Sequence, residues 1–158
     1  MNNDFNKDVI YGEDVEQELI EILEKRGEVC LERGKGFGFD VWMARKVKAS
    51  WYTYMAEAKG DVESARTQNA AIEFECRGKS SGIAITLSSI WYHKLEDGFW
   101  EIKTAKLKEL IYRGKFEFVA PNCGDPGSHT KCYIFDGEYF RSQCIRNLGL
   151  SKPLAAAG

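Results

Sequence analysis

A long apolar run that closes on an acid and an amine constrains the fold of this chain more than any other stretch. It extends from Trp51 to Lys59 and ends in Glu57-Ala58-Lys59. Successive side chains of a β-strand point to opposite faces of a sheet. A strand over this run therefore places Glu57 and Lys59 on one face and turns Ala58 back into the protein.

A second apolar stretch precedes this one and begins with a carboxylate, Asp40. We predict a strand over residues 39–47 that pairs with the Trp51–Lys59 strand as an antiparallel hairpin. The hairpin would bring Asp40 beside Glu57 and Lys59. Two acids and an amine can hold a divalent cation next to a positioned positive charge, an arrangement that suits phosphodiester hydrolysis.

A helix is predicted over residues 12–27, with acids in its first turn, bases in its last turn and Gly27 as its stop. Its apolar stripe contains Val15, Leu19, Ile22 and Leu23. Glu16 lies at the margin of this stripe, where a buried carboxylate is costly unless a cation meets it. Either Glu16 reaches a charged site, or it borders the core and extends to water.

The remaining pattern predicts a mixed α/β fold. Strands are expected over residues 28–32, 70–76, 88–95, 99–103, 116–119 and 132–135, and helices over residues 105–113 and 136–146. Thr104 and Asp136 are the predicted caps of these helices. Residues 1–11 are expected to be a disordered lead-in, residues 12–149 one domain and residues 150–158 a frayed tail.

Composition limits the classes of partner. A chain of 158 residues with a net charge of −2 fits one domain and has no global attraction to nucleic acid, so any such contact needs local cations or bound metal. No apolar run approaches the ~20 residues of a membrane helix.

Cysteine usage bears on the compartment. Five cysteines, an odd number, follow a polar N-terminus, which predicts free thiols in a reducing cytoplasm. A zinc-stabilised domain built on Cys123, His129, Cys132 and Cys144 is a weaker reading, because these spacings match no zinc pattern.

Asp40 followed by Glu57-Ala58-Lys59 on the next strand resembles the signature of the PD-(D/E)xK nuclease superfamily, and most of all its small phage-type members. The similarity continues through Asp61, Arg66-Thr67-Gln68-Asn69, Ile72-Glu73-Phe74-Glu75, Ser81-Gly82-Ile83 with Thr86, and Cys123-Gly124-Asp125. It covers roughly residues 12–135. The chain departs from the family pattern at Gln68 and Cys123, where that pattern has Gly, and at Ser89, where it has Asp.

The resemblance implies a restriction-endonuclease-like core, in which a mixed central β-sheet is flanked by helices. It implies Mg²⁺ as the cofactor, with Mn²⁺ able to substitute. The implied metal ligands are Asp40, Glu57, the backbone carbonyl of Ala58 and Glu16, with Glu18 as the alternative to Glu16. Lys59 would orient the attacking water, and Asp61 and Glu73 would support the site from outside the ligand set. We expect the strand that carries Glu73 to neighbour the strand that carries Glu57.

The implied function is Mg²⁺-dependent endonucleolytic cleavage of DNA, extending to branched or four-way-junction DNA and to a homodimer. A phage-encoded protein acting in the cytoplasm of a bacterial host fits this resemblance. The alternative is a nucleic-acid-binding or regulatory protein that keeps the fold and does not cleave. The cations that could contact DNA are Lys35, Arg45, Lys46, Lys48, Arg66 and Lys79; the alternative is that they lie on solvated turns, which is the favoured reading for Lys79.

Overall fold

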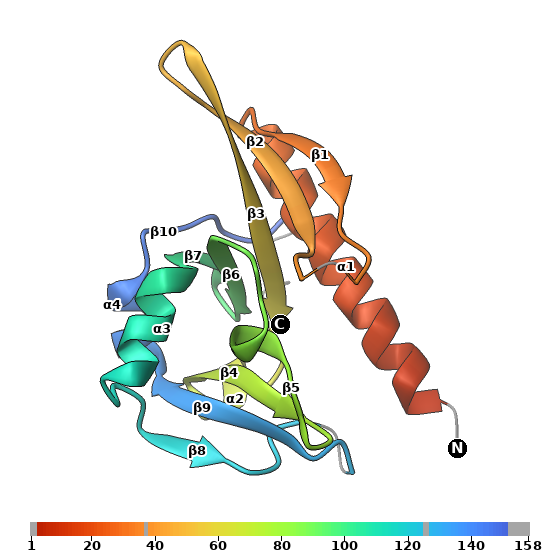
Figure 1. Ribbon diagram of the computed structural model, residues 1–158, viewed down its shortest axis with the longest axis vertical. Helices are drawn as coiled ribbons and strands as arrows, with labels where there is room; N and C mark the ends of the chain where they lie inside the picture. Colours follow the sequence, from red (N-terminus) through yellow and green to blue (C-terminus); the bar gives the residue numbers. More distant parts are fainter. Residues whose placement is uncertain (1–2, 37, 125–126, 152–158) are drawn as a thin grey trace, which may run out of the picture.

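The structure is a computed structural model, which describes residues 3–36, 38–124 and 127–151, with side chains described from residue 11 onward. Within these residues the chain is mixed α/β, with two β-sheets and four α-helices (Figure 1). The fold class predicted from the sequence is confirmed at this level.

The larger sheet carries the candidate site. Its strands, in spatial order, are β1 (Val29–Arg33), β2 (Val41–Val47), β3 (Ser50–Gly60), β6 (Ile90–Leu95), β7 (Gly98–Lys103) and β10 (Arg146–Asn147). Neighbouring strands are antiparallel except β3 and β6, which run parallel. The sheet is therefore mixed, and β3 lies between one antiparallel and one parallel partner.

The smaller sheet contains β5 (Lys79–Ser80), β4 (Asn69–Cys76), β9 (Thr130–Asp136) and β8 (Phe118–Ala120), in this spatial order. The connection from β3 to β6 passes through α2 (Ser64–Thr67), β4, β5 and the 3₁₀ turn η1 (Gly82–Ala84). We predicted that the strand carrying Glu73 neighbours the one carrying Glu57, and this is wrong. Strand β4 pairs with β5 and β9, and the second neighbour of β3 is β6.

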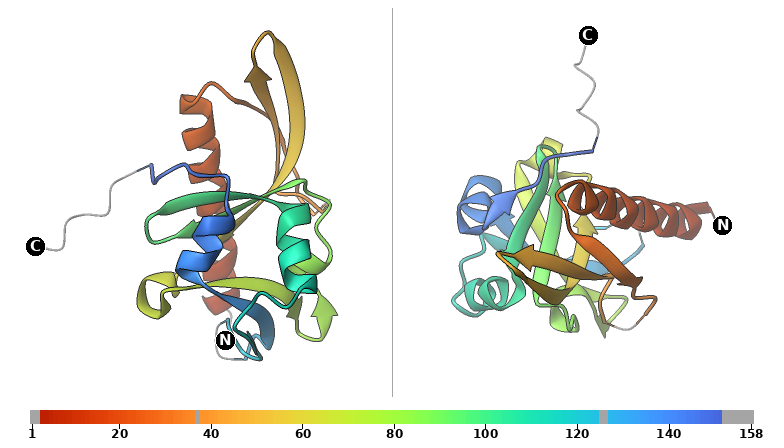
Figure 2. Two further views of the ribbon diagram at one scale, coloured as in Figure 1. Left: turned by 90° about the vertical axis from the view of Figure 1, so that its left-hand side faces the viewer. Right: turned by 90° about the horizontal axis from the view of Figure 1, so that it is seen from above.

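Helices cover both faces of the larger sheet. Helix α1 (Asn3–Lys25) packs on one face, while α3 (Thr104–Tyr112) and α4 (Gly137–Gln143) lie on the other side together with the smaller sheet (Figures 1 and 2). The stripe predicted on the first helix is confirmed, because Leu19 and Leu23 are fully buried against the sheet. No described helix is long and apolar enough to cross a bilayer.

Two apolar cores result from this layering. The core under α1 includes Val41, Met43, Ala56 and Tyr92, which alternate along their strands with residues of the opposite face. The core between the two sheets and the short helices is built on Trp91, Ile102, Leu107, Phe135 and Phe140. Strands β6 and β7 separate the two cores, because each contributes buried residues to both.

Several predicted element ends differ from the structure. Helix α1 begins at Asn3, so most of the expected lead-in is helical, whereas residues 152–158 of the expected tail lie outside the described residues. Asp136 caps α4 as predicted, accepting the N–H of Tyr139 at 2.8 Å. Thr104 does not cap α3, because it lies inside the first turn and its buried hydroxyl has no partner among the described residues.

The cysteine prediction also needs correction. Cys123 and Cys132 form a disulfide, with their Cα atoms 6.2 Å apart, whereas Cys30, Cys76 and Cys144 are free. The bridge is within reach because the loop before β9 folds back on itself, with Cys123 N donating to Thr130 O. The pairing leaves neither of these sulfurs available as a zinc ligand.

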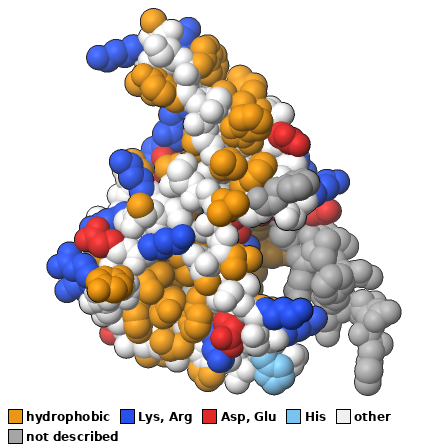
Figure 3. Space-filling model, viewed as in Figure 1, with side chains coloured by type: hydrophobic (Ala, Val, Ile, Leu, Met, Phe, Trp, Pro, Cys, Tyr) orange, Lys and Arg blue, Asp and Glu red, His pale blue; other side chains and the backbone are white. Residues whose placement is uncertain are grey.

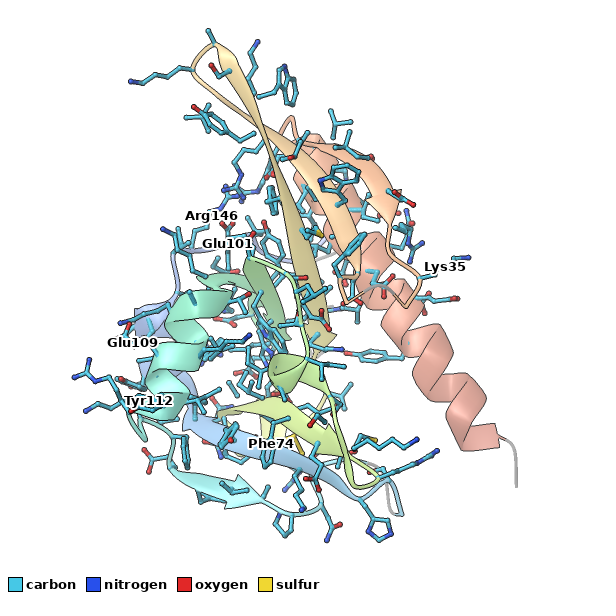
Figure 4. All side chains as sticks on the ribbon, in the orientation of Figure 1. Lys35, Phe74, Glu101, Glu109, Tyr112 and Arg146 are labelled. Carbon is cyan, nitrogen blue, oxygen red and sulfur yellow. A yellow bond between two sulfur atoms is a disulfide. The ribbon has the colours of Figure 1, made fainter. Side chains whose placement is uncertain are left out.

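A buried ionic cluster ties the ends of the larger sheet together on the α1 face. The carboxylates of Glu28 and Glu101 are 7% and 0% exposed, and Arg45 and Arg146 each contact both of them. The hydroxyls of Tyr54 and Tyr92 complete the network. Figure 4 shows Glu101 and Arg146 beside each other at this position. The side chain of Arg45 is 29% exposed and is held by this cluster, so it is not a free cation for DNA contact as the sequence had allowed.

We expect Glu101→Ala to lower the free energy of unfolding by about 3 kcal/mol, because Arg45 and Arg146 would lose a buried shared partner. Urea unfolding monitored by circular dichroism measures the change. Glu117→Ala, an exposed carboxylate on the smaller sheet side, is the matched control and should change the value by less than about 0.5 kcal/mol. Equal effects of the two substitutions would contradict a stabilising role for the cluster.

Candidate active site

Strand β3 brings an acid and an amine together at its C-terminal end. Glu57 is 8% exposed, and its Oε1 lies 3.1 Å from Nζ of Lys59, whose side chain is 35% exposed. Both residues point to the same face of β3, as the alternation predicted, while Ala58 packs into the core under α1. The site is therefore buried on the acid side and open to water on the lysine side.

Asp40 is joined to β3 by its side chain. Strand β2 begins one residue later, at Val41, and Asp40 N donates to Ala56 O at 2.9 Å. The carboxylate Oδ2 of Asp40 accepts the backbone N–H of Ala58 at 2.8 Å, which extends the β2–β3 ladder beyond the last main-chain pair. This bond fixes Asp40 beside Glu57 and Lys59, as the sequence predicted.

Thr86 holds the second oxygen of Glu57. Its hydroxyl lies 2.9 Å from Glu57 Oε2 and accepts the backbone N–H of Ser88. Thr86 comes from the loop after η1, which reaches β3 from the far end of the crossover connection. Thr86 belongs to the family-like motif of the sequence, where no role was predicted for it. The structure shows that it hydrogen-bonds Glu57.

Glu16 approaches the set from α1. Its Oε2 lies 2.8 Å from Nη2 of Arg33, at the end of β1, and its side chain is 24% exposed. Burial raises the pKa of Glu16, the hydrogen bond from Arg33 lowers it, and the negative charge of Asp40 raises it further, so that the net pKa is above its ordinary value. Glu16 is thus within electrostatic range of Asp40, whereas Glu18 is paired with Lys94.

Burial has the largest effect on the pKa values of the site, and the charges of neighbouring groups modify it. Burial raises the pKa of Glu57, Lys59 lowers it and Asp40 raises it, with a net increase. Burial lowers the pKa of Lys59, but Glu57 and Asp40 raise it by more, so the ammonium form is favoured. Asp40 therefore makes ionisation harder for two neighbouring carboxylates, and a positive charge placed between them would relieve this repulsion.

The donor set fits a hard divalent cation in kind. Mg²⁺ takes one or two protein carboxylates and keeps several waters, and Asp40 and Glu57 with the backbone carbonyl of Ala58 supply such oxygens. Each carboxylate oxygen can accept a hydrogen bond and still bind a metal. Among the described residues, no three His, Cys, Asp or Glu side chains lie close enough together to hold a metal ion. Glu16 is paired with Arg33, and it would have to leave this partner to become a ligand.

A buried chain of polar side chains lies directly behind the site. Asp61 Oδ2 accepts the N–H of Ala71 at 2.9 Å and lies 3.1 Å from Nε2 of His93. Trp91 Nε1–H, which can only donate, faces Nδ1 of His93 at 3.3 Å. The proton of this histidine is thus on Nε2 and is donated to Asp61, a role that sequence reasoning did not assign.

Glu73, which was predicted to support the site from outside the ligand set, lies close to it. Glu73 raises the pKa of Lys59 and so lies near it, although it belongs to the other sheet.

The cations predicted to contact DNA lie apart from one another. Lys46 and Lys48 are exposed at the hairpin tip, and Lys79 is exposed on β5. Arg66 is paired with Glu63 at 2.7 Å. Lys35 projects outward on the α1 side of the molecule (Figure 4). Asp125 of the family-like motif lies outside the described residues.

Comparison with protein-family models, with curated proteins and with solved structures gave no match. What the site can do is therefore inferred from its residues and their geometry.

We expect Asp61→Asn to destabilise the protein more at neutral pH than in acid. Burial raises the pKa of Asp61, but the hydrogen bonds from His93 and Ala71 lower it by more. A carboxylate with a lowered pKa contributes stability that is present above the ordinary value of about 4 and is lost as the pH falls through the lowered value.

The expected loss is about 2 kcal/mol at pH 7 and less below about pH 3. Urea unfolding at both pH values measures it, with the exposed Asp14→Asn as the control. A loss of equal size at the two pH values would contradict the interpretation.

Proposed function

We propose that the protein is a Mg²⁺-dependent endonuclease that hydrolyses DNA phosphodiester bonds. The observation that carries the proposal is the meeting of Asp40, Glu57 and Lys59, which are separated along the chain, at one end of the β2–β3 hairpin. A divalent ion, when bound, lowers the pKa of its water and neutralises charge on the phosphoryl oxygens. Asp40, Glu57 and the carbonyl of Ala58 would hold it.

The chain's own groups have separable roles in this proposal. Thr86 fixes the orientation of Glu57, and the N–H of Ala58 fixes that of Asp40. The Lys59 ammonium, charged and partly exposed, would orient the attacking water and offset negative charge on the phosphate. Glu57 is shielded from water, which strengthens each of these electrostatic interactions.

The proposal extends to substrate and assembly on the strength of the sequence resemblance. Branched or four-way-junction DNA would be the substrate, a homodimer the working form, and a bacterial cytoplasm the setting. Incubation with plasmid, linear duplex, single strand and four-way junction, each with Mg²⁺ and with EDTA, identifies the preferred substrate. Absence of cleavage of all four with Mg²⁺ or Mn²⁺ would overturn the proposal.

A second candidate is a nucleic-acid-binding or regulatory protein that does not cleave. It is favoured by the ion pairs Glu57–Lys59 and Glu16–Arg33, which satisfy two of the acids without metal. Metal binding separates the candidates. Titration calorimetry with Mn²⁺ should show one or more sites in the wild-type protein and a weaker or absent site in Asp40→Asn.

We expect Glu57→Gln to reduce cleavage by at least about a hundredfold, since a metal site supplies several kcal/mol of charge stabilisation and each 1.36 kcal/mol is a factor of ten. Binding of DNA in EDTA should remain. Glu63→Gln, an exposed carboxylate outside the site, is the control and should cleave normally. Normal cleavage by folded Glu57→Gln protein would remove this residue from the assignment.

A further inference from the structure

The β2–β3 hairpin exposes large apolar side chains on one face, two of them tryptophans. Trp42, Trp51 and Met55 are 38%, 52% and 38% exposed. Trp42 lies directly opposite Met55, and Lys46 directly opposite Trp51. The hairpin projects from the body of the protein (Figure 1), and Figure 3 shows hydrophobic side chains along it with Lys or Arg side chains at its tip.

A groove runs along this face. Its volume is about 620 Å³, and its lining includes Phe39, Trp42, Thr53, Met55, Leu87 and Ser89. The walls are mainly apolar and aromatic; Thr53, Tyr54 and Ser89 add hydroxyl groups, and Glu32 adds a carboxylate. Such walls suit flat apolar rings that carry hydrogen-bonding edges.

The groove leads toward the candidate active site. Residues 51, 53, 55, 57 and 59 share one face of β3, so Trp51 and Met55 stand in line with Glu57 and Lys59. The six residue steps from Trp51 to Glu57 span about 20 Å at about 3.3 Å per step. At the other end, Leu87 and Ser89 belong to the loop whose Thr86 hydrogen-bonds Glu57.

The charges on the hairpin identify the class of ligand. Lys46 and Lys48 are exposed at the tip, interleaved with the aromatic side chains. Aromatic faces beside cations bind single-stranded nucleic acid, because bases stack on the rings while the phosphates meet the cations. Paired bases inside a duplex do not offer their faces in this way.

We propose that the hairpin binds a nucleic acid strand with unpaired bases and directs it along β3 toward Glu57 and Lys59. Trp42 and Trp51 are the stacking platforms, and Lys46 and Lys48 hold the backbone at the tip. The binding is a property of the hairpin alone, whereas the delivery of the strand to a cleavage site rests on the proposed nuclease function.

The test uses the full chain and a fluorescein-labelled oligothymidine of about twelve nucleotides, with a blunt duplex of the same length, in EDTA so that no cleavage occurs. Fluorescence anisotropy should show tighter binding of the single strand than of the duplex. Trp42→Ala and Trp51→Ala should each weaken single-strand binding by about tenfold, while Trp51→Phe should retain most of it. Tyr112→Ala, which removes a 93% exposed aromatic on α3, is the control and should bind normally.

Circular dichroism confirms that each variant is folded. Single-strand binding that is unchanged in both tryptophan variants would overturn the inference. So would a dimer in size-exclusion chromatography that becomes monomeric in Trp51→Ala, because the face would then be covered by a second copy. A protein that binds the single strand but cleaves nothing with Mg²⁺ would keep this inference and remove the nuclease proposal; the converse result would do the reverse.

Discussion

The hydrogen bond from the N–H of Ala58 to the carboxylate of Asp40 is the contact on which the arrangement of the site depends. It replaces a main-chain pair just where β2 begins, so the ladder between β2 and β3 continues through a side chain. The acid is thereby fixed at the same level of the sheet as Glu57. A side chain that completes a sheet has little rotational freedom left, which is what a preorganised charged site requires.

The buried polar chain of Asp61, His93 and Trp91 supports the end of β3 that carries the site. Asp61 follows β3 directly and connects it to β4 through Ala71 and to β6 through His93. The smaller sheet is therefore attached to the larger one immediately beside Lys59. On the opposite, α1 face of the larger sheet, the ionic cluster pairs Arg45 and Arg146 with two buried carboxylates. Both faces of the sheet near β3 are thus fixed by polar contacts.

Alternation and capping rules predicted the local features of the chain well. They placed the hairpin of β2 and β3, the buried stripe of α1, the Asp136 cap and the common face of Glu57 and Lys59. They failed locally at the Thr104 cap and at the start of α1. They also failed where partners are distant in sequence: the assignment of β4 to a second sheet, the disulfide of Cys123 and Cys132, and the pairing of Arg45 with Glu28 and Glu101 all depend on tertiary contacts that no local pattern encodes.

Gln68 is another position at which the sequence alone did not predict the local structure. It stands where the family-like motif has glycine, yet its φ of 57° and ψ of 23° are the left-handed conformation that glycine adopts most readily. Gln68 therefore adopts a conformation that a glycine at this position would also adopt without strain. The sequence could show only the substitution, because the conformation is imposed by the C-terminal end of α2 and the start of β4.

The parallel pairing of β3 with β6 has a consequence for the order in which the molecule assembles. The β2–β3 hairpin joins residues close in sequence, whereas β6 pairs with β3 across the long connection of residues 61–89. Contacts between distant residues form slowly, since loop-closure entropy is lost before they repay it. We therefore expect Asp40 and Glu57 to meet early in folding, and Thr86 to reach Glu57 in its last stages.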